Sequence, residues 1–232
     1  NFFRLSCAFN PYTTRQMNVS KNGTSAKYGD VISSIIDMQL SDTIDIEFKA
    51  GAGLNLINAD AFIKGPVSRK TKLPLATRRS ITDLIITPTY NQYYKRIFQD
   101  SDLTDTRDDN YSVSQNEDFY FYDITAKFLY DITPSDKLRF HFLKVNNDLN
   151  YDEQSIINTS NEVLNSKLSQ QNLAIGITYT KDWSDRLSTS AQAYVTTYNL
   201  KARNFDILNN QRLIQENQVN EGSAKFDVNY TI

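Results

Sequence analysis

Hydrophobic and polar residues alternate with a period of two along several long segments of the chain. From Tyr120 to Tyr130 every second residue is aromatic or aliphatic, whereas Asp123, Thr125 and Lys127 stand between them. A period of two is typical of a β-strand that has one apolar and one polar face. Similar segments predict eight strands, at about residues 43–52, 54–66, 72–86, 118–131, 137–151, 170–181, 187–203 and 213–232.

Short turns and long polar connections tend to alternate between these strands. In the turns at Thr133–Asp136 and Trp183–Asp185, the pair Ser-Asp is followed by a basic residue and Leu, and Gly65–Lys70 reads as a third reversal. The long connections are expected at about 87–117, 152–169 and 204–212. This distribution predicts an antiparallel meander, and it is how an outer-membrane barrel arranges its loops. We therefore expect an all-β chain that forms part of an antiparallel transmembrane β-barrel.

The composition permits such a barrel and argues against other classes. No stretch approaches the roughly 18 apolar residues of a transmembrane helix, and the mean hydropathy is -0.51. A barrel strand crosses with only about 9 to 11 alternating residues, so half of them can be polar. The aromatic content of 12% suits strands whose ends lie at a lipid interface. A net charge of -2 gives no positive surface for nucleic acid.

The first 40 residues differ from the segments that follow, because they are richer in Asn, Ser and Thr. Their apolar cluster consists of Val31, Ile32, Ile35 and Ile36. We expect residues 1–40 to form a separate small unit and residues 41–232 to form the strands. Asn1 does not begin a signal peptide, and the last alternating segment stops at Ile232 without a turn. Both ends look cut, so we expect an interior piece of a longer protein.

One helical pattern occurs in the connection after the third strand. Tyr90, Tyr93, Tyr94, Ile97 and Phe98 fall at i, i+3, i+4, i+7 and i+8, which predicts a short helix. Its aromatic stripe either packs on the mouth of the barrel or lines a vestibule for a ligand. Tyr90, Tyr93, Tyr94 and Phe98 are therefore the candidate substrate-binding residues.

Motifs of enzymes, cofactor sites and metal centres are absent from the sequence. There is no Gly-rich phosphate loop, His-Glu-x-x-His, Cys-x-x-Cys or Gly-x-Ser-x-Gly. Cys7 is the single cysteine, and we expect it to pack as a small apolar side chain. His141 stands on the polar face of its strand with no neighbour to orient it as a base. The run Asp100–Asp109 lacks the Gly and the closing Glu of a calcium loop and is interpreted as a solvated connection. We expect no catalytic residue, cofactor or metal.

A series of short motifs occurs in order between about residues 20 and 86. Residues 22–37 read Asn-Gly-Thr-Ser-Ala-Lys-Tyr-Gly-Asp-Val-Ile-Ser-Ser-Ile-Ile-Asp, and Gly65-Pro66-Val67, Arg78-Arg79-Ser80 and Asp83-Leu84 follow. The first motif resembles the end of the plug domain in TonB-dependent outer-membrane receptors. The later motifs are similar to the Gly-Pro-Ile, Arg-Arg-Ser/Thr and Asp-Leu elements of the second and third barrel strands in that family. Residues beyond 86 agree with the family in pattern only.

The resemblance implies a transporter in the bacterial outer membrane. The fold would be a barrel of about 22 strands closed by a plug, with the C-terminal part of the plug at 1–40 and the first barrel strands at 41–232. The imported small ligand, a metal chelate, oligosaccharide or peptide, would bind outside, and TonB would act through a segment upstream of Asn1. Outer-membrane lipid, and a surface lipoprotein or other outer-membrane complex subunits, are the remaining expected partners.

Two other interpretations stay open. A complete eight-stranded barrel with a structural or adhesive role would leave the first 40 residues unexplained. A soluble antiparallel binding module would need its apolar faces buried against a second sheet.

Overall fold

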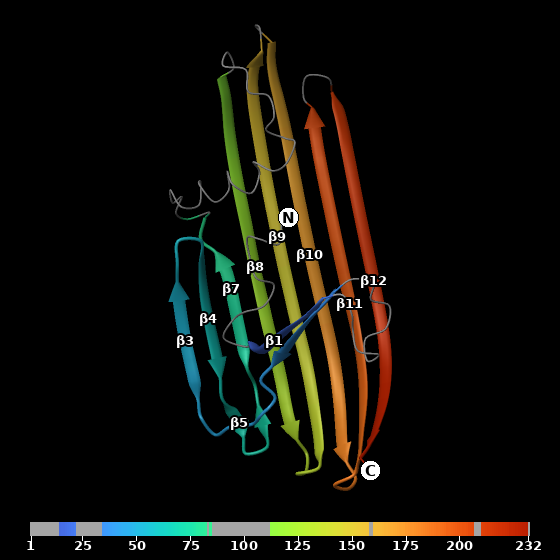
Figure 1. The fold of residues 1–232 in the computed structure, drawn as a ribbon. Coiled ribbons are helices and arrows are strands. Elements are labelled where there is room, and N and C mark those ends of the chain that lie inside the picture. Colours follow the sequence, from blue (N-terminus) through green and yellow to red (C-terminus); the bar gives the residue numbers. More distant parts are fainter. Residues whose placement is uncertain are drawn as a thin grey trace.

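The computed structural model in Figure 1 describes residues 14–21, 34–82, 84, 112–157, 160–206 and 210–231. All regular secondary structure in these residues is β-strand, arranged in two antiparallel sheets. The predicted all-β, antiparallel class is therefore confirmed for the described part of the chain. None of the described residues belongs to a helix that is long and apolar enough to cross a membrane.

The smaller sheet is an N-terminal hairpin. Strand β1 (Thr14–Lys21) pairs antiparallel with β2 (Ser34–Leu40). The sequence pattern did not predict either strand, because most positions of β1 are polar and its two large apolar side chains, Met17 and Val19, are both exposed. With so short an apolar face, side-chain alternation gives little signal.

The larger sheet has ten strands. They are β3 (Lys49–Leu54), β4 (Asn58–Lys64), β5 (Pro66–Ser68), β6 (Thr71–Lys72), β7 (Leu75–Ser80), β8 (Ser112–Asp131), β9 (Asp136–Ile157), β10 (Ser160–Asp182), β11 (Leu187–Asp206) and β12 (Gln211–Tyr230). Their spatial order is β12-β11-β10-β9-β8-β7-β4-β3, with β6 beside β8 and β5 beside β6. The predicted antiparallel meander is confirmed. The sheet is open, because the edge strands β3 and β12 do not pair with each other.

The two faces of this sheet carry unlike side chains. In β8 the buried positions include Asp123, Thr125 and Lys127, whereas Ile124 and Phe128 between them are partly exposed. We call the face of Asp123 the polar face and the face of Ile124 the apolar face. The covered face of β8 thus carries Asp123, Thr125 and Lys127 together with the buried Phe119, Phe121 and Leu129, whereas the face of Ile124 is partly exposed.

The strand register extends both faces across the long strands. One apolar row runs from β8 to β12 through Phe128, Phe140, Ile177, Ala193 and Ala224. The adjacent row on the polar face runs through Lys127, His141, Gly176, Tyr194 and Ser223. Because a one-residue slip would exchange the faces, this register keeps the two rows on opposite faces of the sheet.

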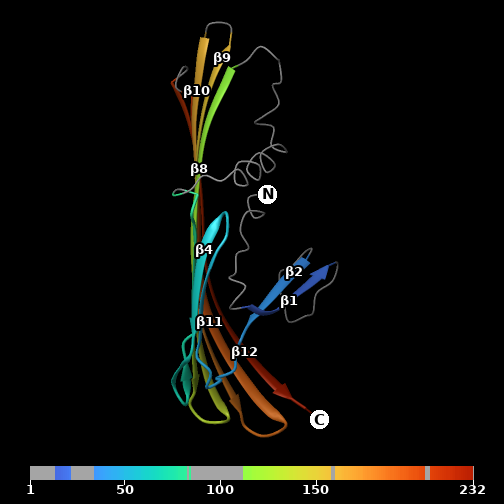
Figure 2. The ribbon, with the colours of Figure 1, turned by 90° about the vertical axis from the view of Figure 1, so that its left-hand side faces the viewer.

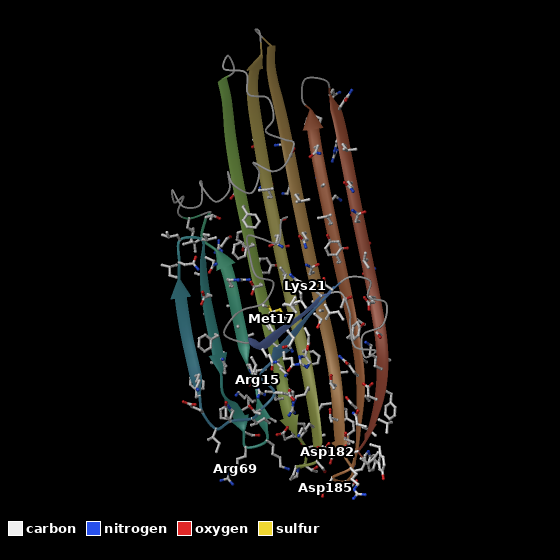
Figure 3. The ribbon with its side chains drawn as sticks, in the orientation of Figure 1. Arg15, Met17, Lys21, Arg69, Asp182 and Asp185 are labelled. Atoms are coloured by element: carbon white, nitrogen blue, oxygen red, sulfur yellow. The ribbon has the colours of Figure 1, made fainter. Side chains whose placement is uncertain are left out.

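The three-residue β3–β4 turn lies at one end of its strands, whereas the β5–β6, β8–β9 and β10–β11 turns lie together at the other end of the large sheet. Figure 3 places Arg69, in the β5–β6 turn, and Asp185, in the β10–β11 turn, at this same end. The predicted reversals at 133–136 and 183–185 fall at the β8–β9 and β10–β11 connections and are confirmed. In the predicted reversal at 65–70 the chain turns at residues 69 and 70, after the short strand β5.

The predicted long connection at 152–169 is wrong. Strands β9 and β10 stay paired up to Ile157 opposite Ser160, so only residues 158 and 159 connect them. The polar run that suggested a loop includes Asn150 and Asp152, which stand on one face of β9. Backbone hydrogen bonds continue a ladder without apolar side chains, so a strand with two polar faces is indistinguishable from a loop by side-chain pattern.

The first predicted strand of the large sheet, 43–52, begins later than expected. Strand β3 starts at Lys49, and residues 41–48 form a connection without strand pairing, which we call the linker. The linker runs from the β1–β2 hairpin to the sheet. Figure 2 shows the hairpin on the side toward which the lower ends of β11 and β12 bend.

Candidate linker-binding site on the polar face

Three cations of the large sheet meet the linker. Lys72 comes from β6, Lys127 from β8 and Arg139 from β9. Lys72 and Arg139 both stand opposite Leu129, which is fully buried, and Lys127 precedes Leu129 by two residues on the same face. Strand alternation therefore gathers three cationic side chains around one apolar residue of the polar face.

Asp42 of the linker is bound by two of these cations. The Lys127 ammonium donates a hydrogen bond to Asp42 Oδ1 at 2.6 Å and another to the Ser41 carbonyl oxygen at 3.1 Å. Arg139 Nε donates to the same Asp42 Oδ1 at 3.0 Å, and its Nη2 donates to the Asp42 carbonyl oxygen at 3.3 Å. One carboxylate oxygen thus accepts two charge-assisted hydrogen bonds, which are stronger than neutral ones.

Asp45 is bound by the third cation. The Lys72 ammonium donates to Asp45 Oδ1 at 2.5 Å and to the Thr43 carbonyl oxygen at 3.4 Å. The linker therefore presents two carboxylates, three residues apart, to cations from three different strands.

Arg139 is also fixed by the sheet itself. Its Nη1 donates to the carbonyl oxygens of Tyr130 and Leu138 at 3.1 and 3.0 Å, and its Nη2 donates to Asp131 Oδ1 at 2.7 Å. These acceptors belong to β8 and β9, so the planar guanidinium is held in place independently of the linker.

Burial makes the linker carboxylates necessary for these cations. The side chains of Lys72, Lys127 and Arg139 are only 3, 6 and 6% exposed, whereas those of Asp42 and Asp45 are 53 and 50% exposed. Removing one partner of a fully buried ion pair costs about 3–5 kcal/mol, and the cost is lower where one partner is half exposed, as here.

Both linker carboxylates have lowered pKa values. Burial alone would raise the pKa of Asp42, but the hydrogen bond from Lys127 and the charges of Lys127 and Arg139 outweigh it. The hydrogen bond from Lys72 lowers the pKa of Asp45, against a smaller opposing effect of burial. Both groups are therefore held in the ionised form that the cations bind.

A second ion pair lies on the same face, outside the linker-binding site. Arg78 of β7 donates through Nε and Nη2 to Asp123 Oδ2 of β8, both at 2.7 Å. The two side chains are 9 and 2% exposed. Their strands pair with Arg78 directly opposite Asp123, so the ion pair joins β7 to β8. Arg78, the first residue of the Arg78-Arg79-Ser80 motif, thus forms an ion pair that links two strands.

His141 lies on the polar face as expected. It stands directly opposite Lys127 in the pairing of β8 with β9 and is partly buried. This position confirms the predicted face of the strand.

The candidate substrate-binding residues cannot be compared with this site. Tyr90, Tyr93, Tyr94 and Phe98, with the predicted helix that carries them, lie outside the described residues. Cys7 and the acidic run Asp100–Asp109 lie outside them too, as do residues 22–33 of the motif that resembles a plug.

The sequence analysis missed the linker-binding site. Alternation put Lys127 on the polar face, and the same pattern extends to Arg139 on the next strand. The sequence did not single out Asp42 and Asp45 as partners of these cations, because residues 43–52 alternate like a β-strand. Only the tertiary path of the linker reveals which carboxylates meet which cations.

The arrangement binds and neutralises carboxylates. No group of three or more His, Cys, Asp or Glu side chains within the described ranges could hold a metal ion. The chemistry that the geometry supports is thus electrostatic recognition of an anionic segment.

Comparison of the chain with protein-family models, curated protein sequences and solved structures found no match. Function is therefore argued from the geometry and from the residue patterns.

Proposed function

We propose that this chain is part of a TonB-dependent transporter of the bacterial outer membrane, in which residues 1–40 are the C-terminal part of the plug domain and residues 41–232 are the first barrel strands. The transporter would import a small ligand across the outer membrane. The observation that carries the proposal is the distribution of polarity over the two faces of the large sheet.

The covered face of β8 buries charged groups, which is unusual for a water-soluble domain. Asp123 and Lys127 are 1 and 5% exposed, next to the buried Phe121 and Leu129, whereas Ile124, Ala126 and Phe128 on the opposite face are partly exposed. Water-soluble proteins bury apolar residues and rarely bury charged ones. A barrel wall needs apolar side chains toward lipid and polar side chains toward its lumen, so this distribution supports a membrane barrel.

The apolar face is confined to a band of suitable height. On β8 it runs over nine residues from Tyr122 to Tyr130, eight steps of about 3.4 Å, or about 27 Å. With strand tilt this matches the outward apolar band of outer-membrane barrels, about 25 Å tall. On β9 the same face becomes polar at this end, with Lys144 opposite Ile124, Asn146 opposite Tyr122 and Asp148 opposite Tyr120. The long strands would thus extend past the lipid on that side.

Aromatic residues mark the lower limit of this band. At the end with the short turns, the apolar face carries Tyr130, Tyr179, Trp183 and Tyr230. Rings of Tyr and Trp are typical of both membrane interfaces. Their position supports an interface at the level of the short turns.

The open edges of the sheet favour a larger barrel over a complete small one. Unpaired backbone groups of β3 and β12 would be costly in hydrocarbon. In the proposed transporter, further strands pair with both edges. The linker on the polar face fits this arrangement, because it leads from the hairpin into the wall.

Localisation and solubility test the proposal. The full-length protein should fractionate with the outer membrane, require detergent for extraction and change its electrophoretic mobility when boiled. A protein that stays monomeric in buffer without detergent would instead support a soluble binding module.

A further inference from the structure

We infer that Lys72, Lys127 and Arg139 form a binding site for a small dicarboxylate, which Asp42 and Asp45 of the linker occupy in this structure. This inference names a ligand class for the polar face, and it rests on the proposed function only in placing that face toward the lumen of a transporter.

The binding groups belong to the sheet, and the bound groups belong to the linker. Lys127 donates its two hydrogen bonds to Asp42 and to the Ser41 carbonyl oxygen, both on the linker. The two hydrogen bonds of Lys72, to Asp45 and to the Thr43 carbonyl oxygen, also end on the linker. When the linker leaves, both ammonium groups lose these acceptors and remain on the wall.

Arg139 keeps its position without the linker. Arg139 is held by the carbonyl oxygens of Tyr130 and Leu138 and by the carboxylate of Asp131. Its Nε, which binds Asp42, therefore stays aimed at the same point. A preorganised guanidinium loses little freedom when it binds a second carboxylate, which favours affinity.

The charge of the site selects for a dianion. The sheet contributes three cations, and Asp131 is the carboxylate that remains paired with Arg139 after the linker leaves. Departure of Asp42 and Asp45 removes two negative charges from these nearly buried cations. A ligand with two carboxylates restores neutrality and the lost hydrogen bonds, whereas a neutral ligand leaves the cations uncompensated.

Exchange between linker and ligand is sterically accessible. The side chains of Asp42 and Asp45 are about half exposed, so water reaches the bound carboxylates although the cations are covered. The linker is tethered and competes at a high effective concentration. The apparent affinity of the native protein for a free dicarboxylate is therefore reduced by the fraction of molecules whose site is occupied by the linker.

Isothermal calorimetry with succinate tests the inference on the purified full-length protein in detergent. Replacing both linker carboxylates, D42N/D45N, should tighten succinate binding by tenfold or more relative to the native protein. Adding K127M to this variant should abolish the gain. The control D182N/D185N changes two acidic residues with the same spacing in an exposed turn and should bind succinate like the native protein.

A second measurement covers the case in which D42N/D45N does not fold. Cys7 is the only cysteine of the given chain, so the C7S/S41C variant, made in a full-length protein without other cysteines, carries a single label site beside Asp42. Succinate should increase maleimide labelling of position 41, and sodium chloride of equal ionic strength should not. A gain below tenfold, unchanged binding after K127M, or labelling that succinate does not alter would overturn the inference. These binding and labelling results do not depend on the fraction in which the protein is found. Failure of the dicarboxylate inference can therefore be distinguished from failure of the membrane proposal.

Discussion

Two ion-pair systems on the polar face account for most of the charge that the large sheet covers at the level of the apolar band. Arg78 with Asp123 joins two neighbouring strands, whereas Lys72, Lys127 and Arg139 join the sheet to the linker. Both partners of the first ion pair belong to strands of the large sheet. The cations of the second system are paired with carboxylates of the linker, which lies outside the sheet, so we expect substitutions in the two systems to have different effects.

Replacing Arg78 with Met should destabilise the protein strongly. The change leaves Asp123, whose side chain is 2% exposed, without its cation, and breaking such a buried pair costs about 3–5 kcal/mol. Urea unfolding of the full-length protein in lipid or detergent measures the loss. The matched control is Arg79→Met on the apolar face, where the guanidinium lies 5.3 Å from the Tyr120 ring centroid and the expected cost is about 0.5–1 kcal/mol. Equal losses for the two variants would contradict the structural role of the ion pair.

Acid should release the linker. The pKa of Asp42 in the folded protein lies below its ordinary value of 3.8, so the stabilisation is complete above pH 3.8 and declines as the pH falls through the folded-state pKa. Asp45, also with a lowered pKa, should follow in the same range. A spin label at position 41 should be immobile at pH 7 and become mobile only when the pH is brought below 3.8.

The Asp42→Asn variant is the control for this titration, because its label should be mobile at both pH values. Release already at pH 5 to 6 would contradict the assignment to the carboxylates, because the pKa values of both lie below 3.8.

At the scale of elements, side-chain alternation predicted the strands of the apolar band well. Strand β8 shows why: its apolar and charged residues alternate without interruption from Tyr120 to Tyr130, so one pattern determines both the strand and its faces. Alternation failed where both faces are polar. In residues 152–169 the ladder between β9 and β10 continues through backbone hydrogen bonds that the side chains do not encode.

The linker was unpredictable for a different physical reason. Asp42 and Asp45 lie near the end of β2, but their partners are 27 to 97 residues away in sequence. Whether residues 43–48 extend β3 or cross the polar face is decided by these distant cations. Local propensity carries no information about them, so side-chain alternation predicted only the face on which Lys127 stands.

An arginine placed at Ala126 tests the apolar face as an element. Ala126 stands midway between Tyr122 and Tyr130 on β8, so it should lie near the middle of the bilayer. Ala126→Arg should cost about 2–4 kcal/mol at that depth, measured by urea unfolding from lipid vesicles. The control Ser190→Arg places the same charge on the polar face of β11, opposite Asp227, and should cost less than about 1 kcal/mol. If Ala126→Arg destabilised the protein no more than Ser190→Arg does, contact of the apolar face with lipid would be contradicted.

At the scale of the whole molecule, the short turns should face the periplasm. The β5–β6, β8–β9 and β10–β11 turns lie together at one end of the large sheet, and bacterial outer-membrane barrels have their short connections on the periplasmic side. An epitope tag between Asp102 and Leu103 should be reached by antibody on intact cells. A tag at Ser184 should become reachable only after the outer membrane is permeabilised. The opposite result would invert the proposed topology.

The central claim, that the apolar face contacts lipid and the polar face does not, is tested most directly by quenching from lipid-borne probes. Single labels at Ile124, Ala126 and Ile177 should be quenched strongly by probes attached to lipid acyl chains in reconstituted full-length protein. Labels at Thr125 and Thr178, on the polar face of the same strands, should be quenched weakly and should respond to a water-soluble quencher. Equal lipid quenching at both sets of positions would contradict the membrane assignment of this sheet.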